Sequence, residues 1–269
     1  MSKTPTFKRI LITRPFPFVT NVQLNRPEKR NAFDDIFWKE IGEAFNFLAT
    51  DSDTRIDLNS SNDLLNPENN EDEENDGQDF ARKARKMREK ILFFQNSLQS
   101  IDSCPKPVIA AIQKACFGGG VDIIAACDIR VAVENTLFSE VDIGLAADVG
   151  SLNRLPKICG NNSWIREISF TARTFDAKEA LQHNLLSKLY ATQEIMKSEV
   201  EKLAQIIASK SPVAVEGTKI ILNYSRDHPV QDSLQFTANW NMSQLFTDDV
   251  PKSAMASFQK KELPKFSKL

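Results

Sequence analysis

The stretch PVIAAIQKACFGGGVDIIAACDIR, residues 107–130, decides the fold. Its first part, PVIAAIQ, is a short apolar run, which is typical of a strand buried on both faces of a sheet. The glycines Gly118 to Gly120 separate this run from a second apolar segment, which we expect to be a buried helix. A buried strand, a glycine turn and a buried helix together predict an α/β fold.

The glycine turn is suited to an anionic ligand. Glycine accepts a positive φ and lets a ligand approach the backbone, and the free N–H groups of a helix start point toward negative charge. Gly118 and Gly119 are therefore candidate oxyanion-binding residues. For three glycines considered alone, the alternative is a tight turn that serves packing only.

Three acidic residues lie in apolar contexts near this turn. Asp122 lies just inside the expected helix, Glu140 follows a short strand in TLFSEV, and Asp148 lies in GLAADVG. Each has a structural alternative: a helix-dipole partner, an exposed strand end, and a cap for a helix entering at Ser151, respectively. Together they predict a proton-transfer site in which neighbouring acids shift one another's pKa values.

The other segments alternate between strands and helices. We expect antiparallel strands over 7–13 and 19–25, long helices over 32–49 and 80–101, and further strands over 128–134 and 136–141. The last third is mostly helical, with helices beginning near Ser163, Asp176, Gln193, Pro212, Val230 and Val250.

The segment between the first two long helices departs from the usual α/β pattern. After a strand and a helix the chain normally returns through an apolar strand, but DSDTRIDLNSSNDLL, residues 51–65, contains no apolar run. Residues 66–79 are acidic and nearly free of apolar side chains, which predicts a solvated loop. We therefore expect a strand to be missing near residues 54–56 and an acidic loop insertion over 59–79.

The composition argues against several classes of protein. A net charge of -2 gives no basic field for nucleic acid, and no apolar run reaches the roughly 18 residues of a membrane span. Four cysteines without a CxxC pair and two histidines argue against a zinc site, so we expect no metal and buried, reduced thiols.

The last three residues, Ser267, Lys268 and Leu269, match the address that a peroxisomal import receptor reads at a free C-terminus. We therefore expect a protein of the peroxisomal matrix, with that receptor among its partners.

Four stretches, NRPEKRNAF, CPKPVIAAI, FGGGVDIIAACDIR and SEVDIGLAADVGSLNRLPKICGN, resemble the enoyl-CoA hydratase/isomerase (crotonase) superfamily, and the likeness covers nearly the whole chain. The last stretch resembles the dienoyl-CoA isomerase branch. Typical hydratases of the superfamily carry glutamate at both acid/base positions. Here the first is Asp122, the second is Glu140 and Asp148 is an additional acid, which is the pattern of the isomerase branch.

The resemblance implies a crotonase-like ββα superhelix core over residues 1–200 and a C-terminal helical trimerisation region over 201–269. It implies isomerisation of 3,5-dienoyl-CoA to 2,4-dienoyl-CoA in fatty acid β-oxidation, without a metal or redox cofactor, since coenzyme A is part of the substrate. Gly119 would donate its N–H to the thioester oxygen. Glu140 would be the base at C2, Asp148 the acid at C6, and Asp122 a polarising group.

One family motif is incomplete. The family carries Phe-x-Ala-Gly-x-Asp after the first long helix, and the N–H of its alanine is the other oxyanion donor. Asp57 matches the acid of the motif and is therefore a candidate oxyanion- or substrate-binding residue. The alanine and glycine are absent, and Thr54 or Arg55 would take the place of the donor only after a loop rearrangement. A shortened transcript product, a gene-model error or divergence would each explain such a gap.

Other functions stay open at this stage. A 3-enoyl-CoA isomerase or an enoyl-CoA hydratase belongs to the same superfamily, and a catalytically impaired acyl-CoA-binding subunit or truncated isoform would fit the missing motif. The resemblance also implies a homo-oligomer, a trimer or hexamer. Phe258 and Lys261 are candidate contacts for the CoA adenine, and the alternatives are a packed aromatic and a solvated lysine.

Overall fold

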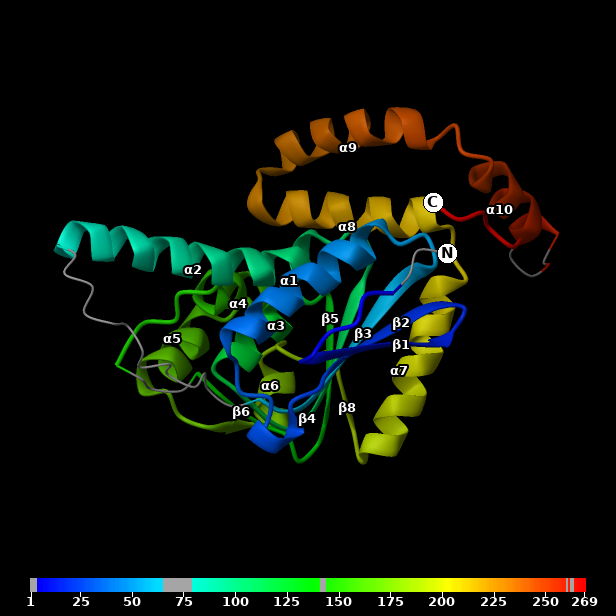
Figure 1. The fold of residues 1–269 in the computed structure, drawn as a ribbon. Coiled ribbons are helices and arrows are strands. Elements are labelled where there is room, and N and C mark those ends of the chain that lie inside the picture. Colours follow the sequence, from blue (N-terminus) through cyan, green and yellow to red (C-terminus); the bar gives the residue numbers. More distant parts are fainter. Residues whose placement is uncertain (1–3, 65–78, 141–143, 260, 262–263) are drawn as a thin grey trace.

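The computed structural model describes residues 4–64, 79–140, 144–259, 261 and 264–269 (Figure 1). Within these residues eight strands form one sheet in the order β1-β2-β3-β4-β5-β8, with β6 beside β4 and β7 beside β6. The strands are β1 (Ile10–Phe16), β2 (Phe18–Leu24), β3 (Thr54–Leu64), β4 (Val108–Phe117), β5 (Ile129–Val133), β6 (Leu137–Ser139), β7 (Phe175–Asp176) and β8 (Lys188–Tyr190).

The helices follow or separate these strands as an α/β fold requires. They are the 3₁₀ helix η1 (Pro27–Lys29), α1 (Asp35–Thr50), α2 (Phe80–Ser103), α3 (Gly119–Ala126), α4 (Ser151–Cys159), α5 (Asn162–Thr171), α6 (Ala177–Gln182), α7 (Gln193–Ala208), α8 (Pro212–Asp227), α9 (Val230–Gln244) and α10 (Asp249–Phe258). The expected starts near Gln193, Pro212 and Val230 are confirmed, and the others lie within one residue of the predicted position.

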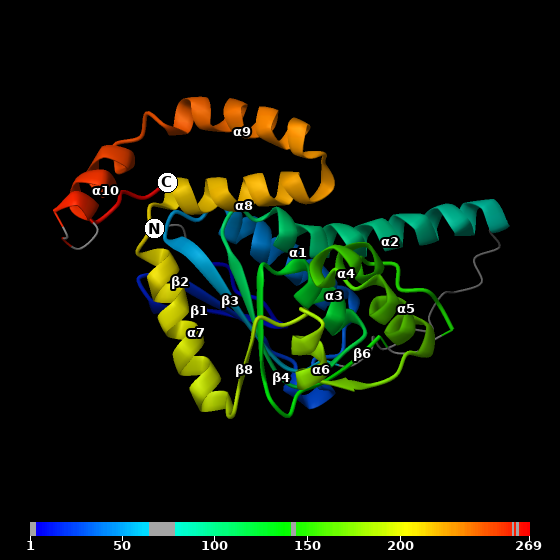
Figure 2. The same ribbon diagram turned by 180° about the vertical axis from the view of Figure 1, so that it is seen from behind.

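The sheet is mostly parallel and is covered on both faces. The β1–β2 and β6–β7 pairs are antiparallel, and the other described pairs are parallel. A large core cluster joins one face to α1, α2, α3 and α5, while α7 packs on the opposite face through Met196, Val200 and Ala204 (Figures 1 and 2). The α/β prediction is therefore confirmed, including PVIAAIQ as the buried start of β4.

The strand expected to be missing is present. β3 runs from Thr54 to Leu64 between β2 and β4, with Val19 opposite Ile56 and Leu58 opposite Ile109. The prediction of a missing strand is therefore wrong, and so is the predicted loop over 59–64, whereas the alanine and glycine of the family motif are still absent from this part of the sequence. The reason is tertiary: pairing on both edges satisfies the backbone of a segment with low intrinsic strand propensity. The rest of the predicted acidic loop, up to residue 78, lies outside the described residues.

Helix α1 carries the aromatic wall of the core. The side chain of Asp34 caps it by accepting the N–H of Phe37 at 2.8 Å. Phe33, just before the cap, stacks on Phe37 with ring centroids 4.9 Å apart and on Trp38 at 4.6 Å. This stack sets one wall of the glycine turn described below.

The C-terminal segment returns to the core after three helices that extend outward. α8 and α9 run side by side and α10 follows at the end away from α5 (Figures 1 and 2). The guanidinium of Arg55, only 7% exposed, donates to the carbonyl oxygens of Ala208 at 2.9 Å and Phe266 at 2.8 Å. One arginine of β3 therefore fastens the end of α7 and the tail together.

Candidate active site

The glycine turn lies between β4 and α3. Gly118 has φ 52° and ψ -119°, a conformation that favours glycine, and its N–H donates to the carbonyl oxygen of Ser139 at 2.9 Å. Its N–H is therefore occupied. Gly119 is the first residue of α3, where a backbone N–H has no partner within the helix. The turn thus presents the N–H of Gly119, with Gly118 supplying the bend.

Asp122 lies in the first turn of α3 and is 3% exposed. Its Oδ1 accepts the backbone N–H of Ser151, the first residue of α4, at 2.6 Å. Burial raises the pKa of Asp122 to about 6, against the lowering effect of hydrogen bonds from Ser151 and the charge of Arg154, while the charge of Asp148 adds to the rise. Asp122 is therefore the more readily ionised of the two buried acids.

Glu140 follows β6 and is 9% exposed, so the alternative of an exposed strand end is wrong. Its Oε2 accepts the hydroxyl of Ser151 at 3.3 Å, and within the described part of the chain its Oε1 has no hydrogen-bond partner. Burial, followed by the charge of Asp122, raises the pKa of Glu140 to about 8. A buried carboxyl of this kind is a strong base once it has lost its proton.

Asp148 lies in the segment before α4 and is half-buried. Its backbone carbonyl accepts Nε2 of Gln95 at 2.6 Å, which ties the segment to α2. The N-cap of α4 is Gly150, without a side-chain cap bond, so the structure does not use Asp148 as a helix cap. Its charge raises the pKa of Asp122, so Asp148 interacts electrostatically with at least one of the two buried acids.

Ser151 and Arg154 were not predicted as site residues. Ser151 joins Asp122 to Glu140, and the charge of Arg154 acts on Asp122. No local pattern in the sequence marks the contact between Ser151 and Asp122, since these residues are 29 positions apart. The only available signal was the expected helix start at Ser151.

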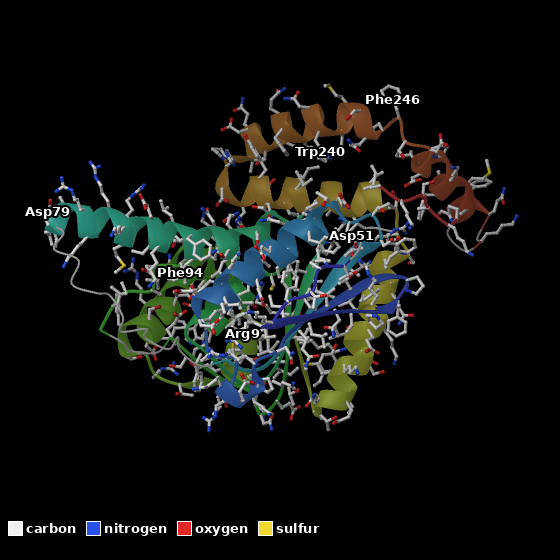
Figure 3. The ribbon with its side chains drawn as sticks, viewed as in Figure 1. Arg9, Asp51, Asp79, Phe94, Trp240 and Phe246 are labelled. Atoms are coloured by element: carbon white, nitrogen blue, oxygen red, sulfur yellow. The ribbon has the colours of Figure 1, made fainter. Side chains whose placement is uncertain are left out.

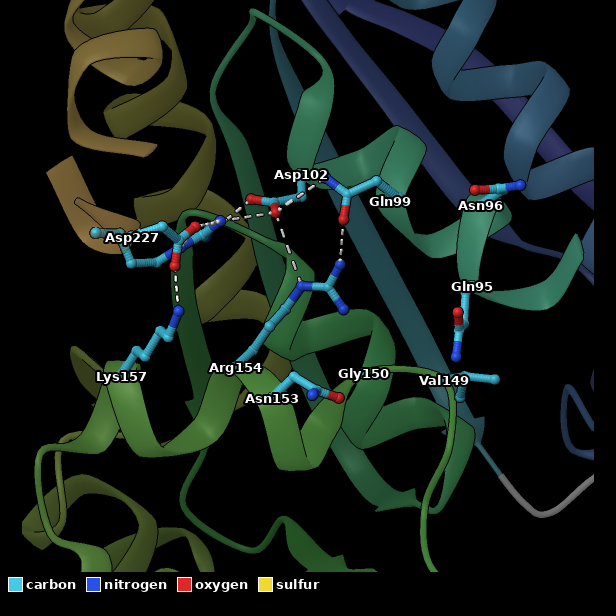
Figure 4. A pocket seen from close by; sticks show the side chains of 11 residues that line it. Gln95, Asn96, Gln99, Asp102, Val149, Gly150, Asn153, Arg154, Lys157 and Asp227 are labelled. Atoms are coloured by element: carbon cyan, nitrogen blue, oxygen red, sulfur yellow. Dashed lines mark hydrogen bonds and ion pairs between the residues drawn. The ribbon is translucent and has the colours of Figure 1, made fainter. Parts of the chain in front are cut away.

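A polar pocket of about 430 Å³ opens beside this region, between α2, α4 and α8 (Figure 4). Arg154 crosses it, with Nη2 donating to Oε1 of Gln99 at 2.8 Å and Nε 3.8 Å from the carboxylate of Asp102. Gly150 has φ +133°, and a Cβ there would overlap Nη1 of Arg154. The absence of a side chain at 150 thus leaves room for the guanidinium.

The register of β3 corrects the expectation for the second oxyanion donor. Phe18 is opposite Thr54, and Asp57 is opposite Val108, the first residue of β4. Gly119 follows the other end of β4, roughly 30 Å along the strand. Thr54 and Arg55 therefore cannot supply the donor in this structure. The backbone of Asp57 is part of β3, and its side chain lies outside the described residues.

The predicted CoA contacts lie away from the acids in a single chain. Phe258 ends α10 and is 92% exposed, and Lys261 is also exposed. Figures 1 and 2 both place α10 at the opposite end of the molecule from α4 and α5. The structure therefore does not bring Phe258 or Lys261 together with Gly119 and Glu140.

The predicted targeting residues are exposed but attached to the core. The carbonyl of Ser267 accepts Nη2 of Arg55 at 3.2 Å, and the ammonium of Lys268 pairs with Asp53. Leu269 is exposed. The tail thus lies along the start of β3.

The four cysteines are buried and free, as predicted. Among the described residues, no cluster of three or more His, Cys, Asp or Glu is placed to hold a metal ion, and no helix combines the length and apolar character needed to cross a membrane.

The family model for enoyl-CoA hydratase/isomerase matches residues 18–268. The chain belongs to this family. Among its curated members, the rat mitochondrial delta(3,5)-delta(2,4)-dienoyl-CoA isomerase is 46% identical, with 98% of this chain and 84% of the rat protein covered. The Arabidopsis thaliana peroxisomal protein of that name is 37% identical, with 93% of each chain covered.

Solved structures of the family agree with the fold. The crystal structure of an enoyl-CoA hydratase from Bacillus anthracis superposes with a TM-score of 0.84 at 21% identity, covering 96% of this chain and 98% of that one. At this identity the structural similarity supports the crotonase fold of the chain. The reaction must be argued from the residues of the site.

Proposed function

We propose that this family member converts 3,5-dienoyl-CoA into 2,4-dienoyl-CoA. The observation that carries the proposal is the hydrogen-bonded chain Asp122–Ser151–Glu140, with Asp148 in its electrostatic reach and the glycine turn next to Asp122. Relatives named as dienoyl-CoA isomerases at 44–46% identity support an isomerase.

The reaction moves one proton and two double bonds. Oε1 of Glu140 removes a proton from C2, the C–H electrons form a C1=C2 bond, and the carbonyl pair moves onto the thioester oxygen to give a dienolate. On collapse the oxygen pair restores the carbonyl, the C1=C2 pair moves to C2=C3, the C3=C4 pair moves to C4=C5, and the C5=C6 pair takes a proton from Asp148 at C6. Glu140 ends protonated and Asp148 ionised, and proton exchange with solvent restores both groups. The negative charge of the dienolate collects on the thioester oxygen, where the N–H of Gly119 stabilises it, a contribution often among the largest in such reactions.

The two raised pKa values assign different roles to the buried acids, with Asp122 as the charged neighbour and Glu140 as the base. With a pKa of about 6, Asp122 carries charge at neutral pH, and with a pKa of about 8 Glu140 holds its proton more tightly. The ionised Asp122 thereby makes Glu140 a stronger base for C2. Neither a metal nor a redox cofactor takes part, and coenzyme A enters as part of the substrate.

The assay follows the ultraviolet absorbance of the conjugated 2,4-dienoyl product from purified protein and a 3,5-dienoyl-CoA. We expect product with the native chain and a loss of on the order of 10³-fold or more with Glu140→Gln, which cannot accept the proton. Well-folded native protein that yields no product would reject the proposal. Hydration of a 2-enoyl-CoA would point to a hydratase, and CoA binding without turnover to an impaired subunit.

We also propose a peroxisomal matrix location and import through the peroxisomal receptor, on the basis of Ser267, Lys268 and Leu269. The names of the relatives give two different locations, because the rat protein is called mitochondrial and the Arabidopsis protein is called peroxisomal. A fluorescent protein fused ahead of the chain should co-localise with a peroxisomal marker and lose that pattern when Leu269 is removed. Mitochondrial fluorescence from the intact fusion would contradict this location.

We propose further that the chain forms a homo-oligomer, a trimer or hexamer, through its C-terminal helices. Large apolar side chains are exposed there, and Phe246 projects from the end of α9 away from the sheet (Figure 3). In such an assembly Phe258 and Lys261 would contact the CoA of a neighbouring copy. Analytical ultracentrifugation should show one oligomer, and a monomer at micromolar concentration would contradict the proposal.

A further inference from the structure

Ser151 contacts both buried acids from a single helix start. Its backbone N–H donates to Oδ1 of Asp122 at 2.6 Å, and its hydroxyl donates to Oε2 of Glu140 at 3.3 Å. The hydroxyl also lies within hydrogen-bond reach of Asp122. The residue is 0% exposed, so water does not compete for these contacts. Asp122 and Glu140, which are distant in sequence, are thus both hydrogen-bonded to one residue.

The two donors of Ser151 differ in what they can do. The backbone N–H is fixed by α4 and always points to Asp122. The hydroxyl has one proton and can rotate, so it can support the charge of only one carboxylate at a time. Because the backbone N–H already donates to Asp122, the hydroxyl is available to donate to Glu140.

We propose that Ser151 is a positioning residue for the isomerisation, which orients the Glu140 carboxylate and directs its unpartnered Oε1 toward the substrate. This role rests on the proposed function for the identity of the base, whereas the contact itself does not depend on it. When Glu140 carries the proton from C2 on Oε1, Oε2 still accepts the hydroxyl of Ser151. Ser151 thereby keeps Oε2 hydrogen-bonded in both protonation states, and proton exchange with C2 takes place at Oε1.

Three other groups on the surrounding elements interact electrostatically with this pair. Cys116 on β4 faces both acids, and burial, with their charges, raises the pKa of its thiol well above the usual value, so it stays neutral. For Asp122, Arg154 on α4 favours the charged form and Asp148 disfavours it. Among the described residues, the charge of Asp122 disfavours the ionised form of Glu140, and the hydroxyl of Ser151 favours it.

The test is a substrate-free titration of the full chain. Carbon-13 labelling of the side-chain carboxyl groups, with Glu140→Gln used to assign the signal, gives the pKa of Glu140 directly by NMR. Ser151→Ala keeps the backbone N–H and removes only the hydroxyl. Ser97→Ala, a buried serine on α2 whose hydroxyl donates to the carbonyl of Phe93 at 3.0 Å, is the matched control.

Removal of the hydroxyl should raise the pKa of Glu140 by about one unit, as expected for a lost hydrogen bond to a charged group. The acid limb of kcat/KM should move upward by the same amount, with about a tenfold loss at pH 7 that recovers at high pH. Ser151→Thr, which restores a hydroxyl, should return the profile toward that of the native chain, and Ser97→Ala should leave it unchanged.

Two results overturn the proposal: an unchanged pKa of Glu140 in Ser151→Ala, or an activity loss that is equal at every pH. The latter would indicate a structural role alone. If the native chain converts no dienoyl-CoA, the proposed function fails, whereas the substrate-free titration still decides whether Ser151 sets the ionisation of Glu140.

Discussion

A Cβ placed on Gly119 would lie 3.0 Å from Cε2 of Phe33, closer than side chains normally pack. Phe33 has little room to move, because it is fully buried and stacks on both Phe37 and Trp38. The aromatic residues before and within α1 therefore disfavour a side chain at position 119, at the first residue of α3.

Gly119→Ala should shift the turn and misplace this N–H. We expect kcat to fall by about 10²–10³-fold, the loss typical for removing one oxyanion donor, with a smaller change in KM. Gly42→Ala in α1 is the control, since its Cβ would meet Ser97 at an ordinary 3.5 Å. Native-like kcat in Gly119→Ala would show that the N–H of Gly119 does not contact the transition state.

Activity should depend on pH through Glu140. The base must be ionised, and burial and Asp122 raise its pKa to about 8. The kcat/KM of the native chain should therefore rise with pH up to about 8 and level off above it. A profile that is already flat between pH 6 and 9 would exclude Glu140 as the base.

The same shift predicts an opposite effect on stability. A carboxyl whose pKa is higher in the folded state than in the unfolded state stabilises the fold fully below its unfolded pKa, and this contribution is lost as the pH rises toward 8. Glu140→Gln, which cannot ionise, should match the native Tm near pH 4 and exceed it at pH 8. The exposed Glu134 provides the control, and Glu134→Gln should show no such pH-dependent gain.

Arg154 should control the ionisation of Asp122. Its guanidinium lowers the pKa of Asp122 against the effect of burial, so Arg154→Gln should raise that pKa above about 6, as measured by carboxyl NMR. Lys157→Gln is the matched control, because Lys157 lies on the same helix and pairs with Asp227 at the surface. Equal shifts in the two variants would show that the effect is not specific to Arg154.

Arg55 should hold the tail on the core. Arg55→Met leaves the carbonyls of Ala208, Phe266 and Ser267 without their charged donor. We expect a loss of about 2–4 kcal/mol in the free energy of unfolding and faster removal of Leu269 by a carboxypeptidase. Arg82→Met, at an exposed arginine of α2, should change stability by less than about 0.5 kcal/mol. Unchanged digestion in Arg55→Met would show that the tail is held by other contacts.

The sequence predicted those parts of the fold whose signals are local. The apolar run of β4, the three glycines and the helical period of α1 and α2 each specify their structure within a few residues. β3 was missed because Asn59, Ser60, Ser61 and Asn62 have low strand propensity. Its strand character comes from β2 and β4, which are distant in sequence.

In the candidate site, too, the features with local signals could be predicted and the long-range contacts could not. The three acids and Gly119 could be named from their contexts and from the family resemblance. The link through Ser151 could not, because it joins the starts of two helices that only the folded chain brings together. The burial of Glu140 could not be predicted from the sequence either, because β6 is short and neighbouring elements determine how exposed its end is.

Deuterium incorporation from heavy water tests the central claim most directly, namely that Glu140 takes a proton from C2 and Asp148 gives one to C6 of a dienoyl thioester. In the native chain the 2,4-dienoyl product should carry deuterium at C6. Asp148→Asn should stop labelling at C6 while Glu140 still exchanges the hydrogens at C2 of the substrate. Delivery of deuterium to C6 by Asp148→Asn at the native rate would contradict the account.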